Sequence, residues 1–152
     1  MPFVNGLRIV TRHAAAGDGP RCARIFLDGR RRAFPWQPAE RFGLDDYYDC
    51  VEDETVLVAE VDGRVVGFVS IDRPQRVVHN LFIDPDWQNR GIGTALLREA
   101  LASLNGPAEL TCAARNAAAR AFYEHNGWVP VRSADAADSP HIIYRKPHPA
   151  CR

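Results

Sequence analysis

The sequence predicts a mixed α+β fold, in which one mixed sheet carries helices on its faces. The chain has 152 residues, of which 46% are hydrophobic and 25% charged, as in an ordinary globular domain. Three consecutive β-branched runs predict antiparallel strands, and a strand–helix–strand unit over residues 76–113 predicts one parallel crossover. We therefore expect residues 1–152 to form a single domain, with a loose tail over 147–152.

The N-terminal third is predicted to contain a short strand and two helices. Alternating apolar residues predict a strand over 7–11, and apolar residues at helical spacing predict a helix over 14–33. Two prolines within residues 34–38 end that helix, because proline lacks a backbone N–H and restricts the residue before it. A second helix is expected over 39–49.

Three strands follow in the middle of the chain. β-branched residues dominate 54–61 and 64–71, and Asp62-Gly63 separates the two runs. An Asp-Gly pair between apolar runs is typical of a two-residue hairpin turn, in which both residues need positive φ. A third run covers 76–83. We expect these three strands to pair antiparallel in chain order.

The C-terminal half alternates helices and strands. The predicted elements are a helix over 91–103, a strand over 108–113, a helix over 116–126 and strands over 128–132 and 141–145. Asn116 is the expected N-cap of the second of these helices, and Gly127 its left-handed stop. A polar link over 133–140 joins the last two strands.

Charge and cysteine content exclude several functional classes. Nineteen basic residues balance nineteen acidic ones, so we expect no nucleic-acid partner and no membrane surface as partner. No apolar run approaches the length of a membrane span, and the first twenty residues lack a secretory apolar region. The cysteines lack the C-x-x-C spacing of zinc sites: Cys22, Cys50, Cys112 and Cys151. We expect no metal and a reducing, cytoplasmic location.

A glycine-flanked loop joins the third strand to the following helix. Gln88, Asn89 and Arg90 supply side-chain donors directly before Gly91 and Gly93. The first N–H groups of a helix are unpaired and carry partial positive charge, and glycine lets an anion approach them. This pattern predicts a pyrophosphate site, although a plain strand–helix turn is the structural alternative. The loop lacks the Gly-Lys-Ser/Thr of a P-loop and the third glycine of a Rossmann fingerprint.

The helix over 116–126 carries a second set of polar groups. Asn116 and Tyr123 are seven residues apart, nearly two turns, and are expected on one helix face with Arg120 between them. Such a face can hold an extended ligand and donate a proton at one end. The alternative is an N-cap asparagine and a half-buried tyrosine. Phe122 and Ala118 are expected in the core.

These two segments resemble the GNAT superfamily of acetyl-CoA-dependent N-acetyltransferases. The Gln88-x-x-Gly91-x-Gly93 loop is similar to the family's motif A, and the Asn-x-x-Ala-x-x-Phe-Tyr-x-x-x-Gly-Trp segment over 116–128 resembles its following helix. The match is dense over residues 56–131. The resemblance implies a mostly antiparallel seven-stranded sheet whose fourth and fifth strands splay apart around acetyl-CoA.

The resemblance also implies roles for individual residues. The pyrophosphate would lie on the loop, the pantetheine arm would pair with the third strand of the central run, and Asn116 would contact the arm from the other side. The expected cofactor-binding residues are Leu81, Phe82, Ile83, Gln88, Asn89, Arg90, Gly91, Ile92, Gly93, Thr94, Asn116 and Arg120. Tyr123 would protonate the leaving thiolate after direct attack by the amine, so Cys112 need not be a nucleophile.

The residue at the expected position of the general base differs from that in part of the family. Histone-modifying members carry a glutamate on the fourth strand, and Val77 occupies that position here. His79 lies two residues further, on the same side of the strand, and an imidazole can relay a proton near neutral pH. His79 is therefore a candidate base; the alternative is a histidine that lines the pocket or bonds locally. The missing glutamate makes a histone-type substrate less expected.

The candidate residues for binding the acceptor amine are mainly aromatic residues near the first helices. Phe34 and Trp36 are candidate acceptor-binding residues, as is His79, with Tyr47 and Tyr48 as further wall residues. The alternative for the Phe-Pro-Trp-Gln-Pro stretch is a packed linker.

The sequence thus predicts transfer of an acetyl group from acetyl-CoA to a primary amine of a small molecule or peptide, by a monomer or homodimer. The alternative function is a non-catalytic acyl-CoA-binding sensor or scaffold.

Overall fold

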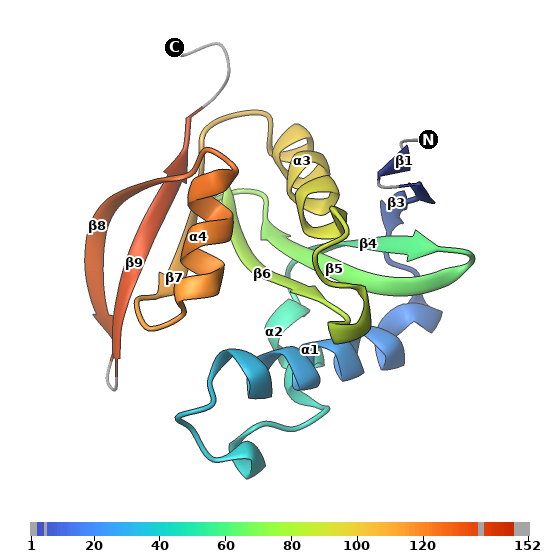
Figure 1. Ribbon diagram of the computed structural model, residues 1–152, viewed down its shortest axis with the longest axis horizontal. Helices are drawn as coiled ribbons and strands as arrows, with labels where there is room; N and C mark the ends of the chain where they lie inside the picture. The colour runs from blue at the N-terminus through green and yellow to red at the C-terminus, as the bar shows by residue number, and fades with distance from the viewer. Residues whose placement is uncertain (1–2, 5, 137–138, 148–152) are drawn as a thin grey trace.

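The computed structural model describes residues 3–4, 6–136 and 139–147. Its main sheet has seven strands in the spatial order β3-β4-β5-β6-β7-β9-β8 (Figure 1). These strands are β3 (Val10–His13), β4 (Thr55–Val61), β5 (Arg64–Asp72), β6 (Val77–Ile83), β7 (Ala108–Ala113), β8 (Val129–Ala136) and β9 (Ser139–Lys146). All neighbours pair antiparallel except β6 and β7, which pair parallel. The mixed α+β prediction is confirmed.

Four α-helices and three short 3-10 turns complete the described fold. The helices are α1 (Gly19–Ala33), α2 (Asp46–Val51), α3 (Ile92–Leu104) and α4 (Ala117–His125). The 3-10 turns are η1 (Ala16–Asp18), η2 (Ala39–Arg41) and η3 (Pro85–Trp87). A two-stranded sheet of β1 (Phe3–Val4) and β2 (Leu7–Arg8) lies beside the main sheet.

Three expected elements differ from those observed. The strand expected over 7–11 is divided between β2 and β3, and the helix expected over 14–33 begins only at Gly19, after η1. The single helix expected over 39–49 was wrong, because η2 and α2 are separated by extended backbone at Phe42. That break lets the Phe42 ring bury against the C-terminal part of α1, where the Arg30 guanidinium lies 4.4 Å from the ring centre.

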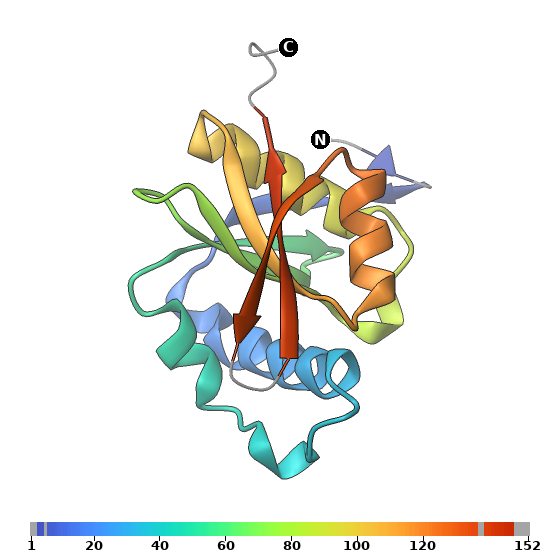
Figure 2. The ribbon, with the colours of Figure 1, turned by 90° about the vertical axis from the view of Figure 1, so that its left-hand side faces the viewer.

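The last two strands are longer than expected. β8 and β9 form a long hairpin that takes in most of the link over 133–140, and Figure 2 shows it in front, with α4 beside it. Residues 137–138 of that link and residues 148–152 of the expected tail, Cys151 among them, lie outside the described residues.

The Asp62-Gly63 turn forms the tight hairpin that the sequence predicts. Asp62 has φ 52° and Gly63 has φ 76°, as a type I′ turn requires. The turn joins β4 to β5, and residues 65–71 of β5 are all buried. β5 therefore runs through the middle of the protein, with helices on both sides of it.

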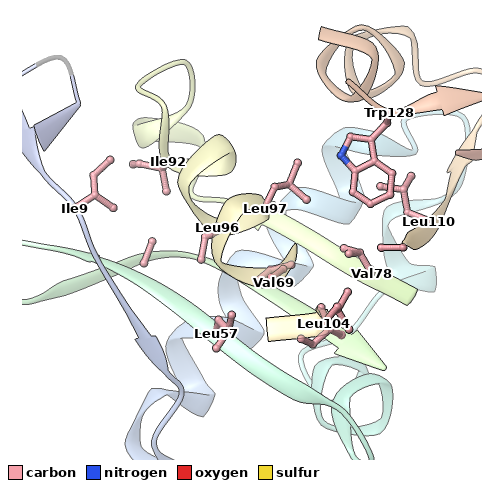
Figure 3. Packing of buried hydrophobic residues seen from close by; sticks show 14 of the residues in the cluster. Ile9, Leu57, Val69, Val78, Ile92, Leu96, Leu97, Leu104, Leu110 and Trp128 are labelled. Carbon is pink, nitrogen blue, oxygen red and sulfur yellow. The ribbon is translucent and has the colours of Figure 1, made fainter. Parts of the chain in front are cut away.

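Two hydrophobic clusters flank the sheet. α1 and α2 pack on one face through Cys22, Phe26 and Tyr47, which meet Phe68 of β5. α3 packs on the other face (Figure 3), and its cluster extends to Trp128 and partly buries α4. Burial of each large apolar side chain contributes about 1.5–3 kcal/mol, so both helix layers are held firmly against the sheet.

Candidate functional site

A cleft, here called the main cleft, opens where β6 and β7 separate. The two strands pair only at Val77↔Glu109 and Val78↔Leu110, and beyond these pairs β6 has no β7 partner. The expected splay of the fourth and fifth strands is thus observed. The main cleft has a volume of about 630 Å³. It is lined by Gly29, Arg32, Ala33, Leu81, Phe82, Ile83, Trp87, Gln88, Asn89, Gly91, Ile92, Gly93, Thr94, Asn116, Ala118, Ala119, Phe122, Tyr123 and His125.

The residues expected to bind the cofactor line this cleft, with two exceptions. Arg90 lies over the Trp87 ring, 4.9 Å from its centre. Arg120 turns away from the cleft: its Nη1 donates to the Ala114 carbonyl at 3.4 Å and its Nε donates to the Tyr144 hydroxyl at 3.3 Å. The shared helix face expected for Arg120 is therefore not observed.

The N-terminus of α3 presents unpaired amides to the cleft. Gly91 is the N-cap residue with φ 83°, and it makes no side-chain capping hydrogen bond. Asn89 also has positive φ, at 62°, so the loop makes two left-handed steps before the helix. The amides of Ile92, Gly93 and Thr94 lack partners within α3, as in any first turn, and the positive end of the helix dipole lies here. This geometry suits an anion such as a pyrophosphate.

Gly93 also lets α3 and α4 approach closely. A Cβ atom at Gly93 would lie 3.0 Å from Cζ of Phe122 on α4. The Thr94 hydroxyl donates to Oδ1 of Asn126 at 3.2 Å, just past the end of α4. The two helices therefore form one wall of the cleft, and a side chain at Gly93 would disturb it.

A buried aspartate fixes the loop from the opposite side. Asp84 follows β6 and accepts a hydrogen bond from the Asp86 amide at 2.9 Å, and Arg21 of α1 donates to its other oxygen. Burial acts to raise the pKa of Asp84, but the Asp86 amide and the Arg21 guanidinium outweigh burial and lower this pKa below its ordinary value. Ionised Asp84 thus connects α1 to the loop that precedes α3.

The start of α4 faces the loop across the cleft. Asn116 caps the helix, because its Oδ1 accepts from the Ala119 amide at 3.1 Å. The predicted N-cap is confirmed, and Asn116 also lines the cleft, so both interpretations of this residue apply together. Both Phe122 and Ala118, expected in the core, line the cleft. Phe122 is partly buried and also packs against the core cluster, whereas Ala118 is exposed, so the core expectation was wrong for Ala118.

Tyr123 of α4 also lines the main cleft. Its ring contacts Phe122, Trp128 and Tyr144, with centroid distances of 5.4, 6.3 and 6.2 Å. Its hydroxyl has no hydrogen-bond partner among the described residues. Burial raises the pKa of Tyr123 well above its ordinary value, so the phenol keeps its proton. A protonated phenol at this position can donate to a leaving group.

A second pocket, here called the side pocket, adjoins the main cleft and shares Tyr123 with it. It has a volume of about 320 Å³. It is lined by Phe26, Arg30, Ala33, Phe34, Cys50, His79, Asn80, Leu81, Phe82, Thr111, Cys112, Ala113, Asn116, Ala119 and Tyr123. Tyr123, Leu81 and Asn116 line both spaces, so a ligand in one can meet a ligand in the other.

The four aromatic residues expected to bind the acceptor lie in different surroundings. Phe34 lines the side pocket. Trp36 lines neither space; its ring packs on Phe34 at 5.5 Å, and the Arg115 guanidinium lies 4.6 Å from its centre. Tyr47 is buried in the core at 4% exposure, and Tyr48 is exposed. Tyr47 as a wall residue is therefore excluded.

His79 has a partner that sequence reasoning missed. It lines the side pocket, and its Nδ1 contacts Oε2 of Glu54. The pair lies 25 positions apart in sequence, and no local pattern around either residue indicates it. Burial lowers the pKa of His79, so its ring is neutral at neutral pH.

The end of α1 supplies a further set of missed residues. Gly29, Arg32 and Ala33 line the main cleft, because close packing of Gly29 on Phe82 holds this part of α1 against β6. Arg32 belongs to the basic run Arg30-Arg31-Arg32, which gives no local sign of this position. Only the packing of α1 on the sheet reveals it.

Cys112 is a poor nucleophile. It lines the side pocket, and burial raises the pKa of its thiol to about 11. Cys22 is also buried as a free thiol, as expected.

Membrane-spanning helices and metal-binding clusters are both absent from the described residues. None of the helices there is long and apolar enough to cross a membrane. The same residues contain no group of three or more His, Cys, Asp or Glu side chains placed to hold a metal ion.

The fold and the cleft define an α+β protein with a cleft at a break in its sheet. A family model described as an acetyltransferase (GNAT) domain matches residues 52–130, which is more than half of the chain. The chain therefore belongs to the GNAT acetyltransferase family.

Individual relatives agree with this assignment. An uncharacterized N-acetyltransferase of Methanocaldococcus jannaschii is 36% identical over 90 residues, 51% of this chain and 40% of that protein. The ribosomal protein bS18-alanine N-acetyltransferase of Salmonella typhimurium is 31% identical over 67% of this chain and 70% of that protein. N-alpha-acetyltransferase RimI of Mycobacterium tuberculosis is 32% identical over 73% and 72%. The chain thus spans less than half of the first of these relatives.

A solved structure has the same fold. The PaiA N-acetyltransferase of Thermoplasma acidophilum, in complex with coenzyme A, gives a TM-score of 0.75 at 18% identity, over 93% of this chain and 99% of that chain.

Proposed function

We propose that this chain transfers the acetyl group of acetyl-CoA to a primary amine of a peptide or small molecule. One observation carries the proposal: the uncapped start of α3, the unpaired edge of β6 and Tyr123 all line one cleft. A charged diphosphate at one end and a reacting thioester at the other match this arrangement.

The cleft offers a different kind of contact to each part of acetyl-CoA. The amides of residues 92–94, with the side chains of Gln88 and Asn89, would hold the pyrophosphate. The main-chain groups of residues 81–83 have no strand partner on the β7 side, so the pantetheine arm can pair with them as an added strand. The thioester would then reach Tyr123.

The chemistry requires two proton transfers. A neutral amine attacks the thioester carbonyl, its nitrogen loses a proton to a base, and the C–S bond breaks with departure of the thiolate. His79 lines the side pocket with a neutral ring and is the proposed base. Tyr123 donates its proton to the thiolate sulfur, and a backbone N–H near Leu81 stabilises the oxyanion. The products are the acetamide and free coenzyme A.

Direct attack by the amine fits the protonated state of the Cys112 thiol in the side pocket. The Cys112 thiol holds its proton with a pKa of about 11, which disfavours an acyl-enzyme at this residue. The acetyl group would pass to the amine in one step.

The relatives suggest which amines to test first. The bS18-alanine enzyme of Salmonella acts, by its name, on an alanine amine of a protein, and the mycobacterial relative is named as an N-alpha-acetyltransferase. A peptide with N-terminal alanine is therefore the first acceptor to assay, followed by free L-amino acids and polyamines.

The experiment has a binding arm and a turnover arm. Calorimetric titration with acetyl-CoA is expected to show one site per chain, and coenzyme A release is expected to rise when a productive amine is added. Failure to bind acetyl-CoA at millimolar concentration would refute the proposal. Binding with no release across the whole amine panel would instead indicate a sensor or scaffold.

A further inference from the structure

The His79 ring is held by a carboxylate from a distant part of the chain. Nδ1 of His79 contacts Oε2 of Glu54, which directly precedes β4. β5 separates β4 from β6 in the sheet, so the contact crosses over β5. Glu54 directly precedes the paired residue Thr55 of β4, and His79 lies in β6 between Val78 and Asn80, which pair with β5. The two strands therefore place the contact.

The Glu54 carboxylate has few other ways to compensate its charge. Its side chain is only 9% exposed, and its second oxygen, Oε1, is buried without a hydrogen-bond partner in the described part of the protein. Burial of a polar atom without a partner is costly, so such groups call for an explanation. The His79 side chain is 44% exposed and lines the side pocket. The carboxylate is thus buried behind a ring that an amine can reach.

We propose that Glu54 is a positioning residue for His79, and that the two act as a pair that removes the proton from the acceptor amine. The inference rests on the proposed function. With Nδ1 held by Glu54, Nε2 is the ring nitrogen left to accept a proton. As the new N–C bond forms, the amine proton moves to Nε2, and Glu54 stabilises the resulting imidazolium. His79 then releases this proton to water.

Other titratable groups line the same pocket. Burial raises the pKa of Cys112 to about 11 and raises that of Tyr123 further, so neither is ionised near neutral pH. Arg30 carries a permanent charge and donates to Asp46 at 3.1 Å. Cys50, from α2, also lines this pocket, and the variant Cys50→Ser serves as its control.

The first test needs no turnover. Protein with ¹⁵N-labelled histidine is titrated by NMR as wild type, Glu54→Gln and Glu52→Gln, with His79→Ala to assign the signal. Glu52 is exposed and two residues away, which makes it a matched control. Loss of the carboxylate destabilises the imidazolium, so the His79 pKa should fall by about one unit or more in Glu54→Gln and stay constant in Glu52→Gln. An unchanged His79 titration in Glu54→Gln would overturn the pairing.

The second test uses acetyl-CoA and the best amine of the panel. In Glu54→Gln, kcat should fall about 10- to 100-fold, and the acidic limb of kcat/KM should move to lower pH, while acetyl-CoA affinity stays constant. Glu54→Asp keeps the carboxylate charge, so the acidic limb of kcat/KM should return part of the way to its wild-type pH. A fall in kcat with an unmoved limb, or a limb that disappears in Cys50→Ser, would refute the pair as base. A wild type that turns over no amine would refute the proposed function, while the NMR result would still decide the pairing.

Discussion

Tyr123 combines three properties that few residues of this chain share. It lines both the main cleft and the side pocket, its hydroxyl has no partner within the described residues, and burial raises its pKa. Each property follows from α4, which places the phenol opposite β6. These properties support the proposal that Tyr123 donates a proton to the leaving thiolate and contributes little to holding the nucleotide.

Tyr123→Phe removes the proton and keeps the ring. We expect kcat to fall about 10²-fold or more, as for loss of a general acid, with acetyl-CoA affinity within about twofold of wild type. Stopped-flow release of coenzyme A and calorimetry measure the two quantities. A large loss of affinity with unchanged turnover would instead make Tyr123 a binding residue.

The sequence predicts the role of a single residue well where that role depends only on its neighbours in the chain. The Asn116 cap and the left-handed Gly127 depend on neighbours in sequence, and both are observed. Arg120 was placed by helical spacing alone, and the Tyr144 hydroxyl and a β7–α4 loop carbonyl turn it away from the cleft. Spacing gives a direction around a helix, but partners on other strands decide where a long side chain goes.

At the scale of elements, the contact between α3 and α4 shapes the anion site. Gly93→Ala would push against Phe122, which lines the cleft. We expect a loss of stability of about 1–3 kcal/mol and acetyl-CoA binding about tenfold weaker. Denaturant unfolding and calorimetry provide the measurements. Gly17→Ala is the control, because a Cβ there meets nothing within 4 Å; equal effects of the two substitutions would contradict the account.

Element types were more predictable than element junctions. The Asp62-Gly63 hairpin, the parallel crossover and the helix–strand order of the C-terminal half follow from periodicity and turn chemistry. The break between η2 and α2 does not, because it arises from the burial of Phe42 against Arg30 of α1. A tertiary contact overrode a helical pattern there.

At the scale of the whole molecule, one buried ion pair connects the α1 layer to the loop of the anion site. Because the pKa of Asp84 is lowered in the folded state, its stabilisation is complete above the ordinary aspartate pKa and is lost as pH falls through the lowered value. Asp84→Asn should therefore cost about 1–3 kcal/mol at pH 7 and much less at pH 2–3. Denaturant midpoints at the two pH values measure this. An equal cost at both pH values would show that charge plays no part.

Long-range pairs mark the limit of sequence reasoning in this protein. Glu54 with His79 and Arg21 with Asp84 join residues 25 and 63 positions apart, and neither pair leaves a periodic trace. Their existence depends on strand order and on how α1 lies over the sheet. Both pairs adjoin the site. Sequence motifs could predict the type of reaction, but the route of the acceptor proton depends on these long-range pairs and could not be predicted.

The central claim is that the start of α3 holds a diphosphate and directs a thioester to Tyr123. A crystal structure with bound coenzyme A tests it most directly. We expect pyrophosphate oxygens about 2.7–3.2 Å from the amides of residues 92–94, with the sulfur beside the Tyr123 hydroxyl. Coenzyme A bound outside the main cleft, or with its sulfur remote from Tyr123, would contradict it.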